Sequence, residues 1–111
     1  MDGTRQYLTF VFTHAYVADA KKLITDEDQR EIERTICEDP FGGKLEAGIR
    51  KIRIPLPGRG KRGGARVVYY YIERKGKVYL LGIFAKNVKT ALSKAEKNEV
   101  RKLTKLLEEE K

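Results

Sequence analysis

Two strand-like runs joined by a tight turn constrain this chain more than any other feature of its sequence. Residues Ala65 to Glu73 and Lys77 to Ala85 are rich in β-branched and aromatic residues, and Lys75-Gly76 between them is typical of a hairpin turn. The two runs are therefore predicted to pair as antiparallel strands. Any fold of this chain has to place the hairpin in a sheet, whose side chains alternate between two faces.

The other segments predict a small α+β domain around this hairpin. A capping box, Ser93-x-x-Glu96, begins a C-terminal helix that runs to about Glu110, with an apolar stripe expected to be buried. We expect one domain over residues 1–111 in the order β-α-α-β-β-β-α, with the helices on one face of a twisted, mainly antiparallel sheet. The remaining expected elements and the apolar stripe are a strand over Tyr7–Thr13, a short helix over Ala15–Ile24, a helix after the N-cap Thr25 to about Cys37, a strand over Ile49–Ile54, and the stripe Val100, Leu103 and Leu107.

Composition narrows the cellular setting. The 111 residues include one cysteine, which excludes an internal disulfide and favours a reducing cytoplasm. No apolar run approaches the roughly 20 residues that a membrane helix needs, and no secretory signal is recognisable. A single histidine beside a single cysteine does not favour a structural zinc site. We therefore expect a cytoplasmic protein without a membrane partner.

The positive charge is concentrated in one stretch. Between Lys44 and Arg66 there are eight lysines or arginines and one acid, Glu46, so this stretch holds nearly all of the net charge of +8. A cationic surface this local favours a polyanionic partner. The alternative is the solvated face of an antiparallel sheet, with the glycine- and arginine-rich loop before Ala65 as a flexible connector.

Strand alternation predicts where these charges point. Lys51 and Arg53 lie on one face of their strand, and if Arg66 projects to the same side the three form a cation cluster. Arginine holds a phosphate through two hydrogen bonds, and neighbouring positive charges lower the pKa of a lysine among them, which would let it act as a base. Interleaved tyrosines suit stacking on RNA bases, although Tyr69 and Tyr71 are better candidates for the core.

Three segments together resemble a known family. They are Gly48–Ile54 with Arg-Lys-Ile-Arg, Gly60–Tyr70 with Gly-Lys-Arg-Gly-Gly-x-Arg, and Tyr79–Asn87 with a terminal Ala-Lys-Asn. In this combination they closely resemble the HigB-type branch of the RelE/ParE toxins, and the element order is similar over most of the chain.

The resemblance implies the toxin of a type II toxin–antitoxin system with a RelE-like fold. Toxins of the RelE kind cut messenger RNA in the ribosomal decoding site without a metal or other cofactor: the ribose 2′-hydroxyl attacks the adjacent phosphate and leaves a cyclic phosphate and a free 5′-hydroxyl. The implied partners are the ribosome with its mRNA and a HigA-like antitoxin. Operator DNA would be contacted only through the toxin–antitoxin complex.

The resemblance also assigns roles to residues. In the matched motifs Arg66 would stabilise the pentacoordinate phosphate, while Lys51 or Arg53 would act as base or orient the phosphate. The candidate catalytic residues are Lys51, Arg53, Arg66, Lys86 and Asn87. The candidate RNA-binding residues are Lys44, Arg50, Arg59, Lys61, Arg62 and Tyr70.

The chain also departs from the family pattern. Some RelE toxins carry a tyrosine after the last strand that stacks on a base, whereas this sequence has no tyrosine after Tyr79. The general acid and the stacking residue are therefore not assigned. Two other functions remain open, a ParE-like inhibitor of DNA gyrase and an inactive RNA- or ribosome-binding domain. The basic pair with Arg66 favours the nuclease, because a gyrase binder needs no phosphate-stabilising cluster.

Overall fold

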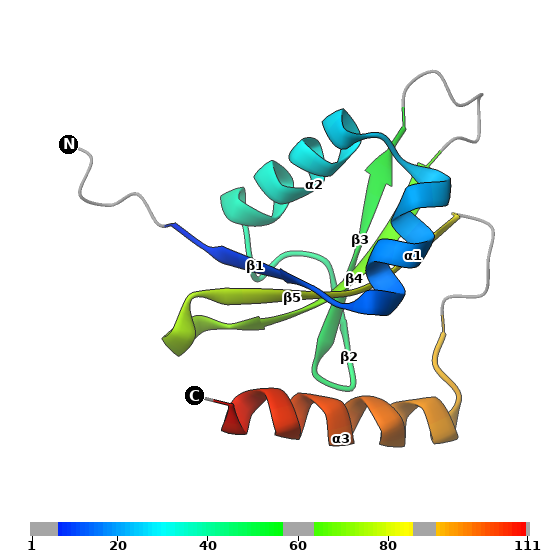
Figure 1. Ribbon diagram of the computed structural model, residues 1–111. Helices are drawn as coiled ribbons and strands as arrows, with labels where there is room; N and C mark the ends of the chain where they lie inside the picture. Colours follow the sequence, from blue (N-terminus) through cyan, green and yellow to red (C-terminus); the bar gives the residue numbers. More distant parts are fainter. Residues whose placement is uncertain (1–6, 57–63, 86–90, 111) are drawn as a thin grey trace.

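A five-stranded mixed sheet forms the centre of the molecule, as Figure 1 shows. The computed structural model describes residues 7–56, 64–85 and 91–110. The strand order is β1-β5-β4-β3-β2; β1 runs parallel to β5 and the other neighbours are antiparallel. The strands are β1 (Thr9–Phe12), β2 (Lys44–Glu46), β3 (Ile49–Pro55), β4 (Gly64–Ile72) and β5 (Lys77–Ala85).

Each helix begins at a hydroxyl-bearing N-cap residue. The hydroxyl oxygens of Thr25 and Ser93 accept hydrogen bonds from the backbone N–H of Asp28 and Glu96, whose carboxylates accept from the two cap N–H groups in return. Both capping boxes satisfy N–H groups that the first helical turn leaves unpaired. The helices are α1 (His14–Leu23), α2 (Asp26–Glu38) and α3 (Lys94–Glu109), and a 3₁₀ turn, η1 (Glu73–Lys75), joins β4 to β5.

The expected hairpin of β4 and β5 is present. Its loop has four residues, two more than the tightest hairpin loop, because the three residues of η1 are followed by Gly76 with φ of 62°. Pairing shifts by one residue between Val68 and Tyr69, so that Leu81 is an extra residue in β5. This bulge leaves the alternation of β4 intact and bends its partner strand.

The short strand β2 was not expected from the sequence. A two-residue loop joins it to β3, with positive φ at both Ala47 (53°) and Gly48 (88°), as in the turns that match the twist of a hairpin. Gly43, with φ of 81°, is the residue before β2. It lies so close to the backbone of Lys51 that a side chain at this position would collide with it. The element order is therefore β-α-α-β-β-β-β-α.

The hydrophobic core lies between α1, α2 and one face of the sheet. Tyr69 shows how closed this layer is: its side chain is fully buried and its hydroxyl donates to the Pro40 carbonyl oxygen at 3.0 Å. Burial raises the pKa of Tyr69 to about 12. The core comprises Tyr16, Ile32, Ile36, Ile54, Leu56, Ala65, Val67, Tyr69, Val78, Leu80 and Ile83.

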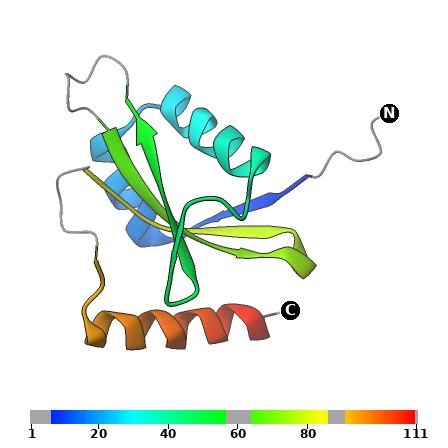
Figure 2. The same cartoon turned by 180° about the vertical axis from the view of Figure 1, so that it is seen from behind.

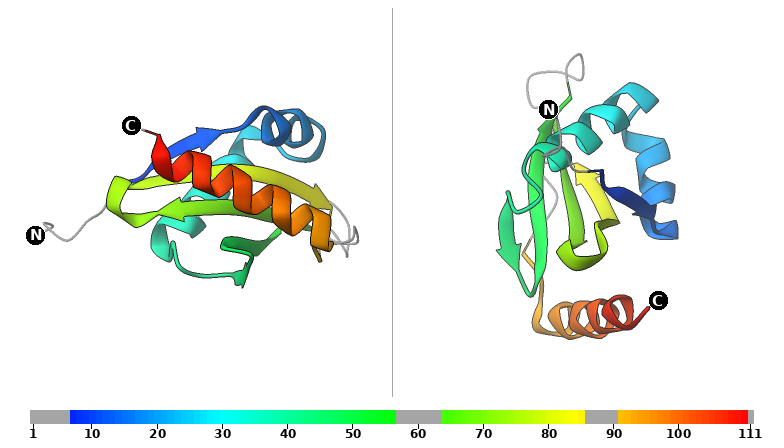
Figure 3. Two further views of the ribbon diagram at one scale, coloured as in Figure 1. Left: turned by 90° about the horizontal axis from the view of Figure 1, so that it is seen from below. Right: turned by 90° about the vertical axis from the view of Figure 1, so that its left-hand side faces the viewer.

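The α+β class is confirmed, but the expectation that all helices lie on one face is wrong. In Figures 1, 2 and 3, α3 runs along the sheet face opposite α1 and α2; Figure 2 gives the view from behind, and Figure 3 shows the two layers edge-on. At the C-terminal end of α3, Glu108 and Glu110 accept hydrogen bonds from the hydroxyls of Tyr70 and Tyr79. These two tyrosines are paired across β4 and β5 and share that face. No residue of α3 is fully buried, so the expected buried stripe is only partly covered. An apolar stripe predicts that a helix packs against a sheet, but it does not determine which face of the sheet the helix covers.

Candidate nucleic-acid interface

The strand register brings the predicted cations onto one face of the sheet. Arg53 pairs directly with Arg66, and Lys51 pairs with Lys44 on one side and Val68 on the other. Directly paired residues point to the same side, so these four cations share a face. It is the face along which α3 lies, since Val67 and Tyr69 point into the core beneath α1 and α2. We call Lys44, Lys51, Arg53 and Arg66 the cation face.

The two arginines of the cation face differ in exposure. Arg53 is exposed to solvent, whereas Arg66 is half-buried. The Nε of Arg66 is buried and has no hydrogen-bond partner among the residues that the structure describes. A buried donor without an acceptor is costly, and an anion seated at this point would supply the acceptor. Arg66 therefore lies beside Arg53 with a donor that no acceptor of the described residues satisfies.

Lys51 is held in an ion pair. Only 7% of Lys51 is exposed, and its Nζ lies 2.6 Å from Oε1 of Glu46. This hydrogen bond from Lys51, together with a second from the Leu92 backbone N–H to Oε2, keeps the pKa of Glu46 below its usual range. The Lys51 ammonium thus lies in direct contact with a carboxylate on this face of the sheet.

Arg50 lies on the opposite face from the cation face. Its Nη1 donates to the Phe41 carbonyl oxygen at 2.6 Å, and its guanidinium stacks 5.4 Å from the centre of the Phe41 ring. That ring meets Tyr71 edge-on, with centroids 5.1 Å apart. Arg50 was grouped with the RNA-binding residues, but these contacts orient it toward the β2 edge of the core side.

Tyr70 lies on the face expected for RNA contact, but its side chain is bonded to α3. Its hydroxyl donates to Oε2 of Glu108 at 2.7 Å, and Arg74 donates to the other oxygen of that carboxylate at 2.8 Å. Burial, followed by the Glu108 contact, raises the pKa of Tyr70 to about 12. In this conformation the ring packs beneath a helix and does not present a surface for a base.

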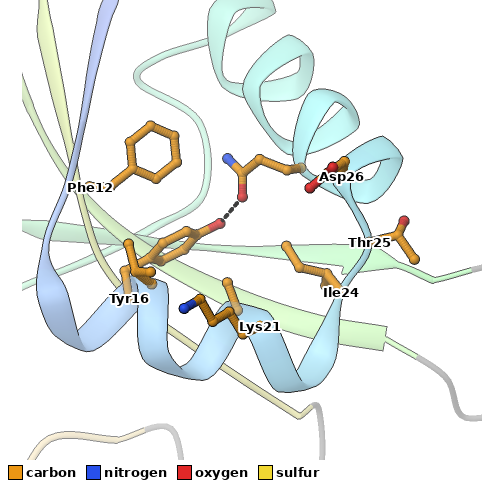
Figure 4. Close-up of a pocket in the computed structure, with 9 residues that line it drawn as sticks. Phe12, Tyr16, Lys21, Ile24, Thr25 and Asp26 are labelled. Atoms are coloured by element: carbon orange, nitrogen blue, oxygen red, sulfur yellow. Dashed lines mark hydrogen bonds between the residues drawn. The ribbon is translucent and has the colours of Figure 1, made fainter.

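One hollow in the described part of the molecule lies away from the cation face. It has a volume of about 160 Å³ between α1 and α2, and Figure 4 shows Phe12, Tyr16 and Ile24 lining it. The Tyr16 hydroxyl donates to Oε1 of Gln29 at 2.6 Å within it. This largely apolar hollow on the core side has Lys21 as the one cation among its lining residues, against the four cations of the cation face. It does not compete with the cation face as the functional site.

Metal sites and membrane spans were also sought in residues 7–56, 64–85 and 91–110. No group of three histidine, cysteine, aspartate or glutamate side chains there could hold a metal ion. None of the helices in these ranges is both long and apolar enough to cross a bilayer.

Comparison with known proteins decides the family. The family described as "RelE toxin of RelE / RelB toxin-antitoxin system" matches residues 7–111. The chain belongs to the RelE toxin family. Its fold resembles that of a chain in the intact E. coli RelBE toxin–antitoxin complex, with a TM-score of 0.55 and 20% identity over 74% of this chain and 100% of that one. The isolated E. coli RelE toxin is similar, with a TM-score of 0.52 and 20% identity over 87% and 99%.

Within this RelE family fold, several of the candidate positions cannot be placed. The start of β4 lies beside the end of β5, where Ala65 pairs with Ala85. Arg66 is the next residue of β4. The remaining candidates lie outside the described residues. They are the catalytic candidates Lys86 and Asn87 and the RNA-binding candidates Arg59, Lys61 and Arg62.

Sequence reasoning missed one participant in this RelE family site. Glu46 was noted only as the single acid in a basic stretch, yet its carboxylate contacts Lys51 and the backbone entering α3. That isolation was itself a usable signal, because a lone acid among eight bases has many possible partners. The three-residue strand that positions it is too short to show a period of two.

Proposed function

We propose that this chain is the toxin of a type II toxin–antitoxin pair and that it cuts messenger RNA on the ribosome. Membership of the RelE family supports the toxin assignment. The shared face of Lys51, Arg53 and Arg66 is the observation that carries the nuclease assignment. An antitoxin of the HigA type is the proposed protein partner, and the cytoplasm is the proposed location.

The proposed reaction needs charge stabilisation more than it needs a new nucleophile. The RNA supplies its own 2′-hydroxyl, which attacks the adjacent phosphorus as the bond to the 5′-oxygen breaks, giving a 2′,3′-cyclic phosphate and a 5′-hydroxyl. Negative charge grows on the phosphoryl oxygens in between. Arg66, whose Nε has no partner among the described residues, would bind this charge, and the exposed Arg53 would orient the phosphate or take part in proton transfer.

The deciding experiment is brief induction in growing bacteria followed by primer extension across an abundant message. We expect discrete cuts within translated codons that disappear when translation is blocked. Arg66→Ala should abolish the cuts and relieve growth arrest, while Arg30→Ala, an exposed arginine on α2 on the other side of the sheet, should leave both unchanged.

The alternatives have distinct outcomes in the same experiment. Full toxicity of well-expressed Arg66→Ala would refute its catalytic role. Growth arrest with intact messages would favour a ParE-like action on gyrase, which a supercoiling assay would then measure. A chain that neither arrests growth nor cuts RNA would be an inactive RNA- or ribosome-binding domain.

A further inference from the structure

Glu46 joins three separate elements through one carboxylate. Oε1 accepts from Nζ of Lys51 at 2.6 Å. Oε2 accepts from the Leu92 backbone N–H at 3.2 Å and lies 4.0 Å from Nζ of Lys97. The side chain of Glu46 on β2 thereby touches β3, the segment that enters α3, and α3 itself.

This carboxylate is more enclosed than the ion-paired acids Glu31, Glu99 and Glu108. Its side chain is 18% exposed, against 50% for Glu31 in its pair with Arg34 and 77% for Glu99 in its pair with Lys102. Exposed pairs of the latter kind are screened by water and salt. Both side chains of the Glu46–Lys51 pair are shielded from solvent, so removing either charge changes the electrostatics of an enclosed site.

The surroundings of Lys51 make its counter-ion important. Lys44 faces it across β2 and β3, Arg53 and Arg66 share its face, and Lys97 approaches from α3. Among these cations the long, flexible side chain of Lys51 would turn toward water if Glu46 were absent. With Glu46 in place, an incoming phosphate meets an ammonium group that is already oriented.

We propose that Glu46 is a positioning residue, which holds Lys51 as an ordered cation beside Arg53 and Arg66 and fastens the start of α3 to the same face. Glu46 acts through Lys51 and does not itself touch the RNA. Its part in cleavage rests on the nuclease function proposed above.

The first test measures the hold of Glu46 on Lys51 without any enzymatic activity. The purified chain is treated with limiting amounts of an amine-acylating reagent, and the modification rate of each lysine is read by peptide mass spectrometry. In the wild type Lys51 should react more slowly than the exposed Lys22 on α1. In Glu46→Gln the rate at Lys51 should rise by about tenfold, the size expected for loss of a charge-assisted hydrogen bond.

A matched control separates this effect from a general loosening. Glu31→Gln removes an exposed ion-paired acid on α2 and should leave the rate at Lys51 unchanged. Circular dichroism should show Glu46→Gln to be folded. An unchanged rate at Lys51 in folded Glu46→Gln would overturn the proposal. If that variant does not fold, the shorter Glu46→Asp is used, and the same criterion applies.

The second test asks whether the pair matters for cleavage. Glu46→Gln should lower kcat for ribosome-bound mRNA by about tenfold with little change in ribosome affinity, since catalysis depends on placement. Glu46→Asp should recover part of the loss. Unchanged kcat in Glu46→Gln would overturn the catalytic part of the proposal. A wild type that cuts no RNA would refute the nuclease function, while the labelling result would still decide whether Glu46 holds Lys51.

Discussion

The two faces of the sheet are made from alternate residues of the same strands, yet they have different physical characters. On β4, Ala65, Val67 and Tyr69 are fully buried beneath α1 and α2. Between them, Arg66 and Tyr70 remain half-buried on the side of α3. One strand thus supplies both the packing that stabilises the fold and the cations that can bind a phosphate. The difference teaches that substitutions on the core face should change stability, while substitutions on the cation face should change binding.

The largest expected effect is the difference in the free energy of unfolding between a side-chain truncation in the core and one on α3. Ile36→Ala on α2 removes a fully buried side chain and should lower the free energy of unfolding by about 3 kcal/mol. Leu106→Ala, at a position that is 64% exposed, should change it by less than about 0.5 kcal/mol. Urea denaturation followed by circular dichroism measures both. Equal losses would show that α3 is as integral to the fold as α2.

The next effect concerns binding and leaves stability almost unchanged. Arg53→Ala should weaken binding to a polyanion such as heparin and reduce the slope of log affinity against log salt by about 1, because one charged contact is lost. Arg30→Ala, on the core side, should not alter the slope. Equal slopes for Arg53→Ala and the wild type would exclude the cation face as the binding surface.

A smaller difference in stability should distinguish two helix N-caps of the same type. Thr25→Ala and Ser93→Ala each remove one capping box. The first should lower global stability by about 1 kcal/mol, because α2 is part of the core. The second should mainly fray the start of α3, visible as faster amide hydrogen exchange there with little change in the urea midpoint. A comparable midpoint shift in both variants would contradict the division between the faces.

The smallest expected effect is an acid-induced loosening of α3. The Lys51 and Leu92 hydrogen bonds lower the pKa of Glu46, and the Tyr70 and Arg74 bonds lower that of Glu108, from an ordinary value of 4.5. Their stabilisation is present above pH 4.5 and is lost as the pH falls below it. Amide exchange in α3 should therefore quicken below pH 4.5 before exchange in the core does.

Two controls accompany the acid experiment. Glu108→Gln should loosen α3 already at neutral pH, whereas Glu99→Gln, in a solvent-exposed pair, should behave like the wild type. Alkali acts on both faces: the pKa of Tyr16 and Tyr69 in the core, and of Tyr70 beside α3, is raised to about 12 from 10, so their contribution is lost as the pH rises above 10. Simultaneous loosening of α3 and core at low pH would contradict the difference expected in acid.

Local signals in the sequence predicted much of the fold. The β4–β5 hairpin was predictable from alternation around Lys75-Gly76, and both capping boxes were predictable from a hydroxyl followed three residues later by an acid. The side of α3 was not, because Val100 and Leu107 define an apolar stripe without indicating which sheet face it meets. The parallel pairing of β1 with β5 was also out of reach, since no local pattern specifies a partner so distant in the chain.

The site, too, was predictable in part: the face on which its cations lie was, and the partners of their side chains were not. Placing Lys51, Arg53 and Arg66 on one face needed only a period of two and one correct antiparallel register. The partners of Lys51, Arg50 and Tyr70 depended on where long side chains turn after the backbone is fixed. Glu46, Phe41 and Glu108 come from a short edge strand, a turn and a helix on the far side, which only the assembled structure brings to these positions.

The parallel pairing of β1 with β5 has a consequence for synthesis of the chain. Phe12 pairs with Leu80, and the Thr13 hydroxyl bonds the carbonyl oxygen of that same residue, 67 positions away. Closing so long a loop carries a large entropy cost and slows folding. A nascent chain that is still in the ribosomal tunnel at β5 has no partner for its first strand, and its core stays open. Whatever the cation face does, it begins to do it only after β5 has left the ribosomal tunnel.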